Sequence, residues 1–168
     1  MRIDLEPRPI AASRTTLSQI MLPEDANPDN HVHGGTIMKL ADSAAGVAAI
    51  RHCRSRVVTA RLDGMDLVAP VYVGNVVTVL ASVNFAGNTS LEVGAKIMAE
   101  NPRTGEVRHV ASAHFVYVSL DEQGRPQPVP PLLAETDEDR RRMGAAAARR
   151  ERRLQLQHRP NPSGDAVE

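Results

Sequence analysis

The chain has 168 residues, which suits one domain with short extensions and is enough to bury a hydrophobic core. Lysine plus arginine number 20, as do aspartate plus glutamate, so no net charge favours nucleic acid or an anionic membrane as a partner. The single cysteine, Cys53, excludes an intramolecular disulfide and a cysteine-rich zinc site. The first residues lack an apolar signal core and no apolar run reaches membrane-spanning length, which predicts a cytoplasmic protein.

The first third of the chain predicts a lead, a strand and a helix. Residues 1–13 contain two prolines and are expected to form a flexible lead, and residues 15–22 (TTLSQIML) predict a strand that Pro23 ends. Residues 33–53 (HGGTIMKLADSAAGVAAIRHC) predict a helix that is rich in alanine and apolar on nearly every face. Such a helix is expected to be buried.

Four valine-rich segments follow the helix and predict strands joined by short, mostly hairpin-like turns: residues 56–68, 74–87, 90–101 and 107–121. A lone apolar helix needs a sheet to cover it. The order of elements therefore predicts an α+β fold in which one antiparallel sheet curls around one long helix.

The C-terminal part changes in character. Residues 122–131 hold four prolines and predict a linker or wrap-around arm, so the domain proper is expected to span residues 14–134. Residues 135–157 are expected to form a charged, solvent-facing helix that begins after an N-cap at Thr136, with its arginines as a solvated face. Residues 158–168 are expected to be disordered.

Asp42 is the most informative single residue. Positions 38, 42, 45 and 49 share one helix face, and the other three are Met38, Ala45 and Ala49. An ionised carboxylate on such a face needs donors or an altered pKa, and both are typical of catalytic acids and bases. The alternative is an aspartate at a gap in the helix surface.

Two histidines precede this helix. His31 and His33 alternate, and Asp42 or His52 could complete a metal-ligand set. No familiar ligand spacing follows, so we predict no metal site.

A glycine pair opens the helix. Gly34 and Gly35 would let a ligand or another backbone come close, and their N–H groups would lie at the positive end of the helix, where an oxyanion can be stabilised. The alternative is a tight turn that needs positive φ.

Three stretches together carry a family resemblance: residues 22–53 (LPEDANPDNHVHGGTIMKLADSAAGVAAIRHC), 57–79 (VVTARLDGMDLVAPVYVGNVVTV) and 87–106 (GNTSLEVGAKIMAENPRTGE). They resemble the hotdog-fold acyl-CoA thioesterases of the cytosolic acyl-CoA hydrolase family. The resemblance implies an antiparallel sheet wrapped around one helix, a homodimer with shared active sites, and often a trimer of such dimers.

The resemblance also implies hydrolysis of fatty acyl-CoA to a free fatty acid and CoA. The family's working residues fall on Asn27, Gly34, Gly35 and Asp42. Asp42 would activate water or attack as a nucleophile, while Asn27 and the glycine N–H groups would position the water and polarise the carbonyl. Asn27 and Asp42 would come from different subunits. No cofactor beyond the CoA of the substrate is implied.

The turn at Gly87, Asn88, Thr89 and Ser90 matches a family turn that lies beside the CoA, although Asn88 stands where the family usually has arginine. Asn30 stands where the family usually has glycine, and asparagine tolerates positive φ well.

Two other functions share this fold. Residues 25–31 (DANPDNH) approach the motif of hotdog enoyl-CoA hydratases, but His31 comes one residue late. The third candidate is an acyl-CoA-binding regulatory module, for which only the C-terminal helix could act as an effector. The helix acid and the glycine pair favour the thioesterase.

Overall fold

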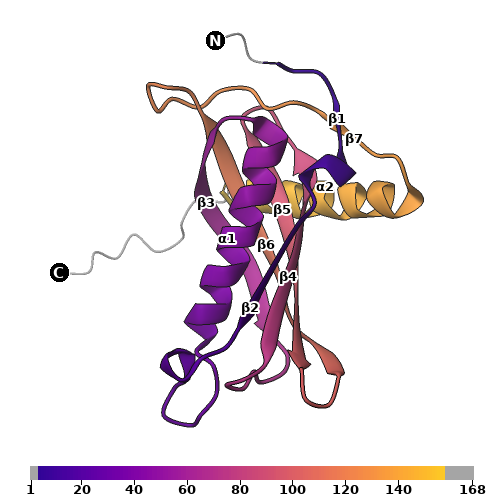
Figure 1. Cartoon of the computed structure of the whole chain (residues 1–168). Helices are drawn as coiled ribbons and strands as arrows, with labels where there is room; N and C mark the ends of the chain where they lie inside the picture. Colours follow the sequence, from indigo (N-terminus) through magenta and orange to yellow (C-terminus); the bar gives the residue numbers. More distant parts are fainter. Residues whose placement is uncertain (1–3, 158–168) are drawn as a thin grey trace, which may run out of the picture.

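The computed structural model describes residues 4–157. Five long strands form one antiparallel sheet in the order β2–β4–β5–β6–β3, and a 20-residue helix lies along one face of it (Figure 1). The bounds are β2 (Thr15–Ile20), α1 (Gly34–Cys53), β3 (Arg56–Leu67), β4 (Val76–Ala86), β5 (Ser90–Asn101) and β6 (Glu106–Leu120). The predicted α+β fold is confirmed, and the long elements lie within two residues of their predicted ends.

The core lies between α1 and the sheet. Alternate residues of β4, such as Val77, Val79 and Val83, are fully buried beneath the helix. The helix meets them with small side chains: Ala41, Ala44, Ala45, Ala48 and Ala49 are all inaccessible. Because alanine is short, the helix can approach the sheet closely.

The opposite face of α1 is open in the single chain. Met38, Val47 and Ile50 are 40%, 40% and 49% exposed, although all three are apolar. The expectation of a helix buried on all sides is therefore wrong for one chain by itself.

Strand β3 forms one edge of the sheet. In the described part of the chain it pairs only with β6, and it has register shifts around Ala60 and Asp63. The next strand in sequence, β4, lies on the far side of β5 and β6, so the connection crosses the sheet instead of forming a hairpin. The prediction of hairpin-like turns holds for β4–β5 and β5–β6 and is wrong here.

The N-terminal lead is ordered where it is described. Residues Arg8–Pro9 form β1, which pairs in parallel with β7 (Leu132–Leu133) at the end of the proline-rich arm. A 3-10 helix, η1 (Ile10–Ser13), follows, and the buried Ser13 hydroxyl accepts a hydrogen bond from the Val83 N–H at 3.0 Å. The expectation of a flexible lead over residues 1–13 is wrong for this part, because it is pinned to the sheet.

Helix α2 (Asp137–Gln157) lies on the other face of the sheet (Figure 1). Thr136 caps it: its hydroxyl accepts the Asp139 N–H at 3.1 Å, and the Asp139 carboxylate accepts the Thr136 N–H at 3.2 Å. Ala146 is fully buried, and Arg149 pairs with the buried Glu92 of β5. The predicted cap is confirmed, but the predicted solvent-facing helix is wrong, because α2 is packed and ion-paired to the sheet.

The predicted disordered tail, residues 158–168, lies outside the described residues. No helix among the described residues is long and apolar enough to cross a membrane.

Candidate active site

The carboxylate of Asp42 is held from two strands. Asp42 lies in the third turn of α1 and is half-buried. The Thr59 hydroxyl of β3 donates to its Oδ1 at 2.9 Å, and the Tyr117 hydroxyl of β6 donates to the same oxygen at 2.8 Å. No hydrogen bond to Oδ2 is found within residues 4–157. One carboxylate oxygen is thus anchored and the other is free of protein donors in the described chain.

Sequence reasoning missed Thr59 and Tyr117. A signal for Tyr117 existed, because Ala111, Ala113, Phe115 and Tyr117 alternate along β6 and all face the core. A buried tyrosine hydroxyl needs a polar partner, and Asp42 is the acid on the facing helix. Thr59 gave no such signal, because the register of β3 is shifted beside it.

Asn27 shapes the loop that leads into α1. Its Oδ1 accepts the backbone N–H groups of Asp29 and His31, both at 3.0 Å, and its own N–H donates to the His31 carbonyl at 2.7 Å. Asn30 closes the turn with φ 57°, as expected for an asparagine that replaces glycine. The loop therefore holds the Asn27 side chain by its oxygen.

Gly34 and Gly35 form the first turn of α1. Neither has positive φ, so the alternative of a tight turn is wrong. A Cβ at Gly34 would lie 3.1 Å from Leu67 Cδ1, whereas a Cβ at Gly35 would meet nothing within 4 Å in residues 4–157. The first N–H groups of a helix have no acceptor inside it and carry its positive end. This end of α1 is open to an incoming group at Gly35.

The candidate residues form two separate groups in one chain. Asn27, Gly34 and Gly35 lie at the start of α1, and Asp42 lies eight residues further, about 12 Å along the helix axis. No hydrogen bond between Asn27 and Asp42 is found in the described chain. A small carbonyl group cannot touch both groups of one subunit at once.

The histidines of the loop have structural contacts. The His31 ring packs edge-on against the Tyr72 ring, with 5.1 Å between the two ring centroids. His33 is the residue directly before α1. Asp25 of the short 3-10 helix η2 (Pro23–Asp25) accepts the Leu22 N–H at 2.9 Å. Among residues 4–157, no three histidine, cysteine or acidic side chains gather as a metal site.

The turn at residues 87–90 lies at the opposite end of the sheet from the start of α1. Its carbonyls hold neighbouring segments: Asn88 O accepts the Val129 N–H and Thr89 O accepts the Ser119 N–H, both at 2.9 Å. Gly87 donates to Ser90 O at 2.7 Å, and the Asn88 side chain is exposed. The structure thus places this turn beside the proline-rich arm.

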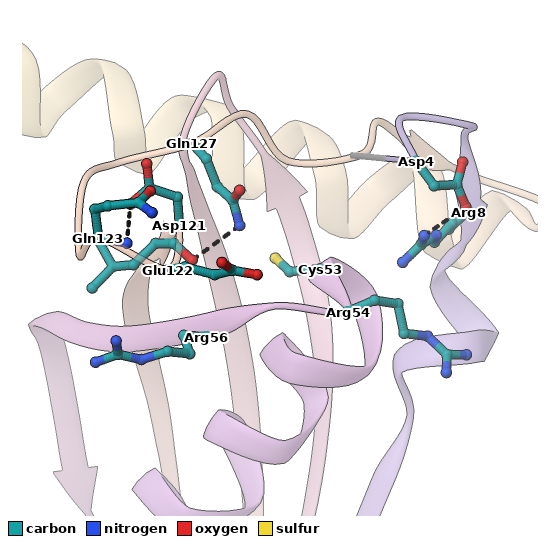
Figure 2. A pocket seen from close by; sticks show the side chains of 10 residues that line it. Asp4, Arg8, Cys53, Arg54, Arg56, Asp121, Glu122, Gln123 and Gln127 are labelled. Atoms are coloured by element: carbon teal, nitrogen blue, oxygen red, sulfur yellow. Dashed lines mark hydrogen bonds and ion pairs between the residues drawn. The ribbon is translucent and has the colours of Figure 1, made fainter. Parts of the chain in front are cut away.

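A hollow of about 420 Å³ lies at that same end, past the last turn of α1. Figure 2 shows Cys53, Glu122 and Gln127 around it, with Arg8 paired to Asp4. Cys53 is buried, and burial raises the pKa of its thiol to about 11, so it packs as a small apolar residue. Asp42 does not line this hollow, whose basic residues are Arg8, Arg54 and Arg56.

Comparisons with known proteins show the family to which the chain belongs. The family model described as the thioesterase superfamily matches residues 29–106. The chain is 40% identical over 144 residues to Protein VdlD of Helicobacter pylori, a match that covers 84% of this chain and 82% of that protein. It is 35% identical over 127 residues to the uncharacterized acyl-CoA thioester hydrolase YkhA of Bacillus subtilis, a match that covers 76% of this chain and 74% of that protein.

Solved structures match over nearly the whole chain. An apo-hexameric acyl-CoA thioesterase superposes with a TM-score of 0.88 at 32% identity, covering 92% of this chain and 99% of that one. An acyl-CoA hydrolase of Staphylococcus aureus, in complex with butyryl-CoA and CoA, superposes with a TM-score of 0.83 at 29% identity. This match covers 89% of this chain and 92% of that one. The chain therefore belongs to the thioesterase superfamily, in its branch of hotdog-fold acyl-CoA thioester hydrolases.

Proposed function

We propose that the chain hydrolyses fatty acyl-CoA in a site built from two copies of itself. One copy supplies Asp42 with its partners Thr59 and Tyr117, and the other supplies Asn27 and the N–H groups of Gly34 and Gly35. The observation that carries the proposal is the Asp42 carboxylate: one oxygen is anchored, and the other has no protein donor within residues 4–157. It lies on a helix whose exposed apolar face and neighbouring edge strand suit a second copy.

The separation of the two groups supports a shared site. Asn27 and the glycines cannot act on a carbonyl next to Asp42 of their own chain, because about 12 Å of helix lies between them. Two chains related by a two-fold axis place one copy of each group in each of two sites. A dimer, or a hexamer like that of the solved thioesterase, is therefore part of the proposal.

The residues varied in a solved relative support the same set. The S. aureus hydrolase has been solved with alanine in place of an asparagine, an aspartate or a threonine. The spacings between these three residues in that protein equal the spacings between Asn27, Asp42 and Thr59 here. Thr59 therefore joins the proposed site.

The proposed reaction balances with water and acyl-CoA alone. The water oxygen bonds to the thioester carbonyl carbon while its proton passes to Asp42, and the carbonyl oxygen becomes an anion held by the glycine N–H groups and Asn27. The C–S bond then breaks, and the proton goes to the CoA sulfur. In the alternative role, Asp42 attacks first and water hydrolyses the acyl-enzyme. Neither route calls for a separate cofactor.

The CoA portion is proposed to reach the turn at Gly87, Asn88, Thr89 and Ser90. Support comes from the neighbouring hollow, where the exposed Arg54 and Arg56 could meet phosphates in place of the arginine that the turn lacks. A cytoplasmic location, where acyl-CoA is made and used, completes the proposal.

A substrate panel tests this function. Saturated acyl-CoAs of several chain lengths and an enoyl-CoA are offered to the wild type and to Asp42→Ala, and free thiol and enoyl absorbance are followed. We expect thiol release from saturated substrates and a loss of at least about 100-fold in Asp42→Ala. The proposal fails if no saturated substrate releases thiol, or if folded Asp42→Ala keeps full activity.

A further inference from the structure

We propose that Tyr117 is a positioning residue that, together with Thr59, fixes Oδ1 of Asp42 and so assigns the chemistry to Oδ2. The proposal rests on the function proposed above and deepens it. It concerns which carboxylate oxygen reacts, and it holds whether Asp42 takes a proton or attacks the carbonyl.

The geometry of the two donors carries the inference. Both hydroxyls lie within 2.9 Å of Oδ1, and no donor to Oδ2 is found among residues 4–157. A carboxylate oxygen that accepts two short hydrogen bonds has its lone pairs occupied, so a water or a carbonyl carbon meets the other oxygen. The asymmetry thus selects Oδ2.

Tyr117 is the more rigid of the two donors. Its side chain is 2% exposed, its ring packs beside Phe115, and it comes from β6, a central strand. Its hydroxyl also lies 3.0 Å from the backbone carbonyl of Asp42. One hydroxyl therefore contacts both the helix backbone and the carboxylate, which restricts rotation of the Asp42 side chain.

The helix leaves room for this contact. Gly46 lies one turn after Asp42, and a Cβ there would lie 3.8 Å from the Tyr117 hydroxyl, at ordinary van der Waals distance. Burial and the hydrogen bond to Asp42 raise the pKa of Tyr117, so the hydroxyl keeps its proton across the working pH range. Tyr117 acts as a donor and not as an acid.

The chain contains only two tyrosines, which makes a matched test possible. Tyr117→Phe removes the hydroxyl next to Asp42, and Tyr72→Phe removes one from an exposed ring. We expect Tyr117→Phe to lower kcat by about 10- to 100-fold with little change in KM, since a hydrogen bond to a charged group is lost. The acidic limb of its pH–rate profile should move to higher pH, because the ionised carboxylate has lost a donor. Tyr72→Phe should keep the wild-type profile.

A spectroscopic readout does not depend on turnover. In the Tyr72→Phe background, uniform 3-fluorotyrosine labels Tyr117 alone, and its ¹⁹F resonance should shift when Asp42→Asn weakens the acceptor. Wild-type kcat and pH profile in folded Tyr117→Phe, with Asp42→Ala inactive, would overturn the role of Tyr117 and leave the proposed function standing. An unchanged ¹⁹F resonance in Asp42→Asn would also overturn it. Full activity in Asp42→Ala would instead overturn the proposed function.

Discussion

The Arg149 guanidinium on α2 lies 2.6 Å from Oε1 of Glu92, a carboxylate that is only 1% exposed on the outer face of the sheet. Arg153 reaches the other oxygen of Glu92 at 3.2 Å and also pairs with Asp63 of β3. These contacts tie the C-terminal helix to both a central and an edge strand. A buried charge whose partner is removed is strongly destabilising.

Replacing Arg149 should therefore destabilise the fold. We expect Arg149→Ala to lower the free energy of unfolding by about 3 kcal/mol, because Glu92 keeps its burial but loses its main partner. Urea denaturation with one spectroscopic probe measures the change. Arg152→Ala, on the exposed face of the same helix, is the control and should stay within about 0.5 kcal/mol of the wild type.

Mixing two inactive variants tests the shared site. Asp42→Ala and Asn27→Ala should each be inactive, but a heterodimer has one site with both substitutions and one with neither. After dissociation and reassembly of an equal mixture, we expect about a quarter of wild-type thiol release, because half of the dimers are mixed and carry one intact site each. If each site came from one chain, the mixture would remain inactive.

Gly35 should separate stability from activity. A methyl group there meets nothing within 4 Å among the described residues of one chain, and alanine favours a helix over glycine, so Gly35→Ala should fold with equal or slightly higher stability. It should nevertheless lose thiol release, because the methyl group stands where the thioester carbonyl would approach the helix end. Gly144→Ala in α2 also has open space and is the control, with a stability gain of up to about 1 kcal/mol and unchanged activity.

His52 should make the fold sensitive to mild acid. Its Nε2 lies 2.8 Å from the Pro130 carbonyl, its Nδ1 has no partner in the described chain, and burial lowers its pKa from the ordinary 6.5. Because the unfolded chain then binds the proton at higher pH than the folded chain, stability is full above pH 6.5 and falls as the pH drops towards the folded pKa.

Chemical denaturation from pH 8 to pH 5 measures this dependence. His52→Gln should flatten the curve in part, because burial also lowers the pKa of His114 and its contribution remains. His109→Gln, at an exposed histidine, is the control for the substitution itself. A wild-type stability that does not change below pH 6.5 would contradict the prediction.

The sequence predicts the long elements well because their signals are local. Valine alternation marks the strands, and the alanine-rich run between the glycine pair and Cys53 marks α1. The short β1 and β7 were missed, since two-residue strands that pair across the chain leave no period to detect. The packing of α2 was also missed, because an arginine that faces Glu92 has the same sequence appearance as one that faces solvent.

The candidate site, too, could be predicted from the sequence only in part. Asp42 and the glycine pair were predictable because an acid on an apolar helix and glycines at a helix start are visible in sequence order. The partners of Asp42 come from two neighbouring, paired strands: Thr59 from β3 and Tyr117 from β6. Thr59 and Tyr117 lie side by side only in the observed register of β3 against β6. No local sequence pattern fixes that register, because it shifts next to Thr59.

The parallel pairing of Arg8 with Leu132 sets the order in which the chain can fold. It joins residues near the two ends of the domain, so it closes a loop that contains α1 and the whole sheet. If this loop closes before its contents are ordered, the loss of chain entropy costs more free energy than the two-residue pairing of β1 with β7 returns. We therefore expect the hairpins β4–β5 and β5–β6 to form early and β1 to join last. Refolding probes placed at Arg8 should respond more slowly than probes in β5, and a ribosome-bound chain that ends before Leu132 should hold its five-stranded sheet without the β1–β7 pair.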